Sequence, residues 1–105
     1  MTERSPFGLF LAANPTIAGA FSELVRVQVE ANPLDSRTKH LLNVALQAAH
    51  RNATGVRLHA GMARDSGIPL EEVLGAVLMN LHLGGIIPVL DALPAVYEGY
   101  GDARD

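Results

Sequence analysis

Four histidines carry the side chains of this 105-residue sequence that exchange protons most readily near neutral pH: His40, His50, His59 and His82. His59 stands out because its neighbours one helical turn away are all small or apolar. Those neighbours are Gly55, Val56, Met62 and Ala63. A histidine on such a face either lies in the core, bonded to a backbone carbonyl, or lines a pocket and transfers protons. The sequence leaves both interpretations open.

Neutral polar residues recur at three- and four-residue steps beside an apolar helix face, at His40, Asn43, Gln47 and His50. This stripe is either the solvated side of an amphipathic helix or, since it lacks Lys and Glu, the wall of a pocket or a wet interface. Asn80 and His82 similarly interrupt an apolar helix. They either tie that helix to a neighbour through hydrogen bonds or face His59 across a pocket.

Composition excludes several kinds of chemistry. With no cysteine, the chain has no disulfide, thiolate nucleophile or zinc–thiolate site. No histidine pair has metal-ligand spacing, so we expect no metal. Eight basic against eleven acidic residues give a net charge of −3, which argues against nucleic-acid binding. We find no signal peptide and no apolar run of about 18 residues, so we expect no membrane partner and a cytoplasmic location.

Helical spacing dominates the chain, and strand signals are nearly absent. We therefore predict an all-α fold, a single domain over residues 1–105 built as a bundle of about five to six helices. An N-terminal arm should occupy residues 1–13 and a frayed tail residues 98–105. The predicted helices cover 15–31, 35–49, 54–66, 69–83 and 86–97, and the fourth should be buried at the centre. With 49% hydrophobic residues in so short a chain, apolar surface should remain for a partner subunit.

The segment PLDSRTKHLL at 33–42 resembles the opening motif of the carboxymuconolactone decarboxylase/alkylhydroperoxidase D-like family. The features after it follow the order found in that family. They are an alanine-rich helix, a helix with His59, the segment SGIPLEEV at 66–73, an apolar helix, and Gly84-Gly85 before a last helix. The resemblance covers about nine-tenths of the chain and implies an alkylhydroperoxidase D-like helical fold.

The redox branch of this family carries two cysteines, and here Asn52 and Gly55 stand in their places. Thiol peroxidase chemistry of that type is therefore excluded. A glutamate of that branch is replaced by His40. Cysteine-free members include decarboxylases that act on a lactone carboxylic acid and keep the histidine. The resemblance thus implies His59 as the proton-transfer residue, with His40 supporting it.

A pocket of this kind should bind a small, carboxylated molecule. We expect it to be lined by Asn43, Gln47, Asn52, Gly55 and His82, with Arg51 holding the substrate carboxylate. The family resemblance also implies a homo-oligomer, a trimer or hexamer, with pockets near subunit contacts. Two hypotheses remain. The chain is a candidate carboxy-lyase without a cofactor, or it is a non-catalytic oligomeric ligand-binding or structural module that retains the fold.

Overall fold

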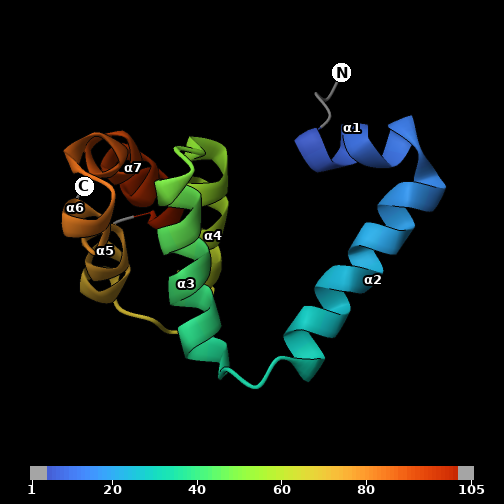
Figure 1. The fold of residues 1–105 in the computed structure, drawn as a ribbon, viewed down its shortest axis with the longest axis horizontal. Helices are drawn as coiled ribbons and strands as arrows, with labels where there is room; N and C mark the ends of the chain where they lie inside the picture. The colour runs from blue at the N-terminus through green and yellow to red at the C-terminus, as the bar shows by residue number, and fades with distance from the viewer. Residues whose placement is uncertain (1–4, 102–105) are drawn as a thin grey trace. The chain divides into compact units, whose positions relative to one another are not determined.

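The computed structural model describes residues 5–101, and within that range every regular element is a helix (Figure 1). The all-α prediction is therefore confirmed. The helices are α1 (Pro6–Ala13), α2 (Pro15–Ala31), α3 (Ser36–Ala49), α4 (Ala53–Asp65), α5 (Leu70–Leu78), α6 (Asn80–Leu83) and α7 (Ile86–Tyr100). Contacts divide the chain into two compact units, one ending at Pro33 and the other beginning at Leu34.

The N-terminal unit consists of α1 and α2, each begun by a side-chain cap followed by proline. Ser5 Oγ accepts a hydrogen bond from the Gly8 amide, and Asn14 Oδ1 accepts one from the Ile17 amide, both at 3.0 Å. Within the arm expected over residues 1–13, the Ser5 cap starts a helix over 6–13. Residues 1–4 lie outside the described range.

Aromatic packing joins the two helices of this unit. The Phe10 ring meets the rings of Phe7 and Phe21 edge-on, with centroids 5.9 and 5.8 Å away. Beyond these contacts, much of α2 is apolar and exposed, including Ile17 and Leu24. Between them the two helices bury little apolar surface, and Ala18 is the buried residue of α2.

The second unit is built around α4, which packs against α3 on one side and against α7 on the other. The close approach of α4 and α7 requires Gly99, because a Cβ there would collide with the backbone carbonyl of Arg57. Small and β-branched side chains fill the core between these helices and α5. They are Val44, Ala48, Val56, Ala60, Ala63, Ile68, Val73, Val77, Val89, Ala92, Ala95 and Val96.

Polar contacts of the side chains of Arg57, Arg64 and Tyr100 hold the end of α7 in place. Arg57 donates to Glu98 at 3.1 Å, and the Tyr100 hydroxyl donates to the Ile68 carbonyl at 2.7 Å. The frayed tail expected over residues 98–105 is therefore wrong for Glu98–Tyr100, which continue α7 up to its left-handed cap at Gly101. Residues 102–105 lie outside the described range.

The apolar stretch 69–83 forms two helices, not the single buried helix expected from its composition. The first, α5, ends at Leu78, and the four-residue α6 begins at Asn80. Only one stripe of α5 is buried, through Val73 and Val77, because α3 and α7 do not enclose its other sides. Leu83 at the end of α6 is 75% exposed. No helix in the described range is long and apolar enough to cross a membrane.

Candidate functional site

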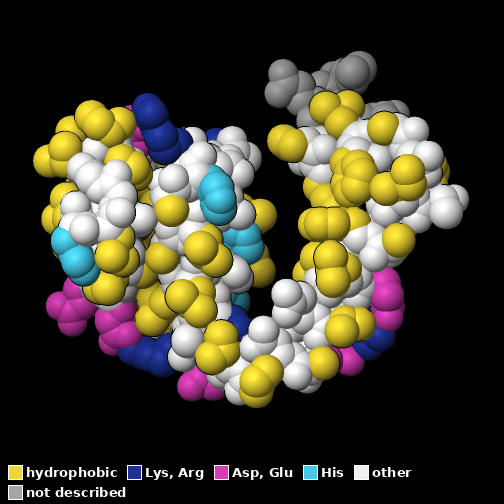
Figure 2. Space-filling view, viewed as in Figure 1, with side chains coloured by type: hydrophobic (Ala, Val, Ile, Leu, Met, Phe, Trp, Pro, Cys, Tyr) yellow, Lys and Arg dark blue, Asp and Glu magenta, His cyan; other side chains and the backbone are white. Residues whose placement is uncertain are grey.

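His40 and His59 come together because α3 and α4 form a helical hairpin. His40 lies in the first half of α3 and His59 in the middle of α4. Both side chains are partly buried, and the charge of His40 acts electrostatically on His59. Figure 2 shows histidine side chains gathered over these two helices. The structure thus brings together the two residues expected to do the chemistry.

The pKa of His59 lies below its ordinary value of 6.5, chiefly because burial disfavours the charged imidazolium and secondly because His40 can carry a like charge. The Nδ1 atoms of both histidines are buried and have no hydrogen-bond partner among the described residues. An unpartnered buried nitrogen destabilises the folded state, whereas a core histidine is normally bonded. This pair is therefore unlike the satisfied core histidine considered from the sequence.

Ser66 is a neighbour of this pair that the sequence did not single out. Its Oγ lies 3.0 Å from His40 Nε2, and it stands at the C-cap of α4. Gly67 follows it with a φ of +84°, a left-handed backbone conformation that glycine adopts most easily, and the chain turns there. The antiparallel hairpin puts the end of α4 beside the start of α3, and only knowledge of that pairing could have identified Ser66. Its contact fixes the orientation of the His40 ring.

The turn between α3 and α4 has the hydrogen bonds of a Schellman motif. The Asn52 amide donates to the Gln47 carbonyl at 2.9 Å and the Arg51 amide to the Ala48 carbonyl at 3.0 Å. Arg51 takes the left-handed position, with φ of 57°, that glycine usually occupies. Its guanidinium binds Asp91 of α7 at 2.8 Å, so the group expected to hold a substrate carboxylate already has an anionic partner.

A cluster of side-chain amides occupies the positions at which the resemblance noted in the sequence implies thiols in the redox branch. Asn52 caps α4, its Oδ1 accepting from the Gly55 amide at 3.1 Å. Asn52 Nδ2 donates to Gln47 Oε1 at 2.9 Å. A Cβ at Gly55 would collide with Gln47 Oε1, so the Gln47 amide fills the space that a side chain at Gly55 would take. Residues His40, Gln47, Asn52, His59 and Ser66 are called the polar seam below.

The remaining predicted residues lie at or beyond the edge of this seam. Asn43 is partly buried on α3, one turn from His40 and one from Gln47. His82 is exposed on α6. Asn80 of the same helix donates a hydrogen bond to the Ala45 carbonyl of α3, so α6 lies on the side of α3 opposite His40. The structure therefore does not bring His82 to the seam. No three histidine, aspartate or glutamate residues of the described chain are grouped as metal ligands.

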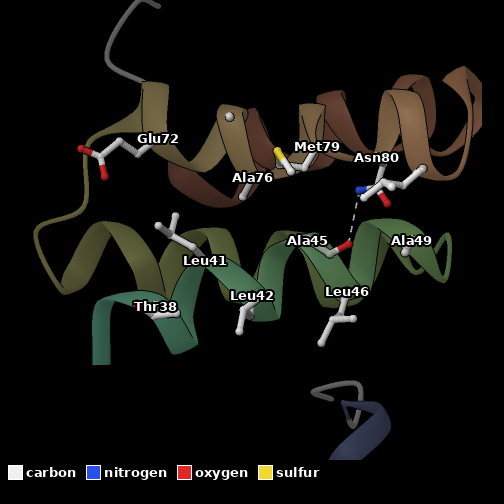
Figure 3. A pocket seen from close by; sticks show the side chains of 12 residues that line it. Thr38, Leu41, Leu42, Ala45, Leu46, Ala49, Glu72, Ala76, Met79 and Asn80 are labelled. Atoms are coloured by element: carbon white, nitrogen blue, oxygen red, sulfur yellow. Dashed lines mark hydrogen bonds between the residues drawn. The ribbon is translucent and has the colours of Figure 1, made fainter. Parts of the chain in front are cut away.

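An apolar pocket of about 510 Å³ lies on that other side of α3 and was not predicted. Figure 3 shows its two facing walls, one from α3 and the other from α5 and α6, with Glu72 and Asn80 toward opposite ends. Asn80 is buried, its Nδ2 donating to the carbonyls of Val77 at 3.1 Å and Ala45 at 3.4 Å. The pocket is called the apolar groove. Its lining is Thr38, Leu41, Leu42, Ala45, Leu46, Ala49, Glu72, Gly75, Ala76, Met79, Asn80 and Leu83.

Comparison with known proteins identifies one family. The sequence profile of the carboxymuconolactone decarboxylase family matches residues 15–98, which include α2 to α6 and most of α7. No curated protein and no solved structure shows significant similarity to the chain. The family match agrees with the motif at 33–42 and covers both catalytic candidates, His40 and His59.

Proposed function

Because this chain belongs to the carboxymuconolactone decarboxylase family, we propose that it removes carbon dioxide from a small lactone carboxylic acid without a cofactor. His59 is the proton-transfer residue of this proposal, and His40 supports it. The observation that carries the proposal is the pair of partly buried imidazoles with unpartnered Nδ1 atoms and a lowered His59 pKa. Perturbed titrating groups of this kind are typical of functional sites.

The proposed reaction follows from what an imidazole can do beside a carboxylate. The bond between the substrate carbon and its carboxylate breaks, and carbon dioxide leaves. The electron pair stays on the substrate as an enolate, with its charge on an oxygen. The His59 imidazolium then gives a proton to the carbon and regains one from water. Its lowered pKa makes the imidazolium a stronger acid, and the hydrogen bond between Ser66 and His40 supports a fixed geometry for the pair.

The test is release of carbon dioxide from a muconolactone-type acid by the purified chain. We expect saturable turnover that follows the protein concentration. A rate equal to the rate in buffer alone, with an acid that binds, would refute catalysis. The variant His59→Gln serves as the inactive comparison because glutamine is uncharged and similar in size.

A second candidate function is a ligand-binding module without catalysis, and the apolar groove supports it. The groove has the volume of a ligand pocket but is lined by no histidine. Such a module would bind an apolar compound without changing it. Calorimetry with a medium-chain fatty alcohol as probe, together with the turnover assay, separates the two functions. Binding of the alcohol without turnover of the lactone acid would favour the module.

The proposal includes a homo-oligomer, a trimer or hexamer as the family resemblance implies, in the cytoplasm. Leucines and isoleucines are exposed in both units, and they support association because burying apolar side chains away from water is favourable. Light scattering should give a mass three or six times the 11.1 kDa of one chain. A mass equal to that of one chain would refute the oligomer.

A further inference from the structure

We propose that the side-chain NH₂ group of Gln47 binds an oxygen of the substrate in the polar seam, and that Asn52 is the positioning residue that turns this NH₂ group toward the ligand. The inference rests on the proposed function and adds a substrate-binding residue to it. It starts from the hydrogen bonds of the amide cluster, whose donor and acceptor roles can be assigned in only one way.

The donor and acceptor roles are assigned starting from the N-terminus of α4. The backbone amide of Gly55 can only donate, so the side chain of Asn52 must turn its Oδ1 toward it. Asn52 then turns its Nδ2 toward Gln47, which must present Oε1 as the acceptor. The orientation of both side-chain amides is thereby fixed by one backbone N–H.

In this chain of hydrogen bonds, Gln47 Nε2 is a donor that has no acceptor. Among the described residues, no group accepts a hydrogen bond from it. Gln47 is itself held twice by Asn52, through its carbonyl by the Asn52 amide and through Oε1 by the Asn52 side chain, both at 2.9 Å. A donor fixed in place without an acceptor is what a binding site offers to a ligand oxygen.

The position of this donor fits the proposed chemistry. Gln47 lies over Gly55, and His59 follows Gly55 by one helical turn on the same face of α4, about 6 Å along the helix. A small lactone acid spans that distance. When its carbon receives the proton from His59, the Gln47 NH₂ group can donate to the lactone carbonyl or carboxylate oxygen. Such a donor stabilises the charge that develops as carbon dioxide leaves.

The test uses two variants that disturb Gln47 without replacing it. In Asn52→Asp the carboxylate still caps α4, but its second oxygen accepts where Nδ2 donated. Gln47 must then turn its NH₂ group toward Asp and its Oε1 toward the ligand. In Gly55→Ala the new Cβ displaces the end of the Gln47 side chain and adds no charge. Matched controls are Asn14→Asp, at the cap of α2, and Gly19→Ala, where a Cβ meets nothing within 4 Å.

The probe is a saturated γ-lactone carboxylic acid, which lacks the conjugation needed to lose carbon dioxide. Its dissociation constant is measured by calorimetry, and the Gln47 side-chain amide and His59 imidazole are followed by NMR. We expect the acid to shift both resonances in the native chain. Asn52→Asp and Gly55→Ala should each weaken binding about tenfold, and the controls should change it less than twofold. The methyl ester, which has no charge, should show the same loss with Asn52→Asp.

The outcomes separate the two proposals. If the acid shifts His59 but leaves the Gln47 amide unmoved, or if both variants bind as tightly as the native chain, the role of Gln47 is refuted and the proposed function stands. If the ester binds Asn52→Asp normally and Gly55→Ala binds the acid normally, charge repulsion alone explains the loss and the inference is again refuted. If the acid shifts neither residue, the seam does not take a lactone acid and both proposals fail.

Discussion

The two sides of helix α3 differ in how their polar groups are satisfied. On the side of the polar seam, His40 and His59 each have a buried Nδ1 without a partner. On the side of the apolar groove, the buried Asn80 amide donates to two carbonyls. An unsatisfied buried group costs stability, about 1–3 kcal/mol, and natural proteins tolerate that cost mainly at sites of function. The difference therefore points to the seam as the site of chemistry and to the groove as a surface for apolar contacts.

The largest effect expected from this comparison is on catalysis. His59→Gln should lower the rate of carbon dioxide release at least 100-fold, because general acid catalysis typically contributes 10²–10⁴-fold. The matched variant Leu42→Gln, on the groove side of α3, should keep the rate within about threefold. Steady-state kinetics on both variants checks this. An equal loss in Leu42→Gln would show that the two sides of α3 do not differ in function.

The free energy of unfolding should respond in the reverse order, with a larger loss from replacing Asn80 than from replacing His59. Asn80→Ala should lower the free energy of unfolding by about 1–3 kcal/mol, since the carbonyls it satisfies are left without this donor and a small cavity opens. His59→Leu should leave stability unchanged or raise it, because it removes a buried nitrogen without a partner. Urea unfolding of the two variants measures both effects. A larger loss in His59→Leu would mean that His59 is a structural residue.

The pKa of His59 shows whether the two imidazoles of the polar seam interact. His40→Asn removes a like charge, so the pKa of His59 should rise. It should still stay below 6.5, because burial is the larger cause of the shift. NMR titration of the His59 imidazole gives the value. An unchanged pKa in His40→Asn would show that the two rings do not interact.

The same shift predicts how folding depends on pH. His59 binds a proton less readily in the folded than in the unfolded chain, so its contribution to stability is fully present above pH 6.5. That contribution is lost as the pH falls through the lowered pKa of the folded state. His59→Gln should remove this part of the acid destabilisation in urea unfolding series. A parallel pH dependence in both proteins would contradict the lowered pKa.

The smallest expected effect concerns Arg51 in the turn between the two helices. Arg51→Ala breaks an exposed ion pair with Asp91, which is worth at most about 1 kcal/mol. Because its guanidinium already has this partner, the KM for the lactone acid should change less than about twofold. Kinetics and urea unfolding test both points. A tenfold higher KM would return Arg51 to the role of carboxylate ligand that the sequence suggested.

Local sequence signals predicted most helix ends correctly. Asp35 accepts from the Thr38 amide at 2.7 Å, as its position before α3 suggested, and Asn14-Pro15 begins α2 as expected. Composition did not predict burial correctly where the burial of a helix depends on which helices pack against it. The apolar residues of 69–83 predicted a buried helix, yet only the stripe facing the core is covered, because the other sides face α3 across an open groove.

The residues of the candidate site could be named from the sequence, but their hydrogen bonds could not. His40 and His59 follow from residue type and the family motif. The contact of Ser66 with His40 and the link between Gln47 and Asn52 require the geometry of the hairpin. That geometry depends on a left-handed Arg51, where glycine would have been the recognisable signal. Pairing between helices is thus the information that single-residue patterns lack.

One NMR titration tests most directly the claim that the seam, and not the groove, takes the substrate. The saturated γ-lactone acid is added while the imidazole signals of His40 and His59 and the methyl signal of Met79 in the groove are followed. We predict saturable shifts of both imidazoles with the same dissociation constant and no shift of the Met79 methyl. A shift of Met79 with unmoved histidines would place the ligand on the other side of α3 and contradict the account.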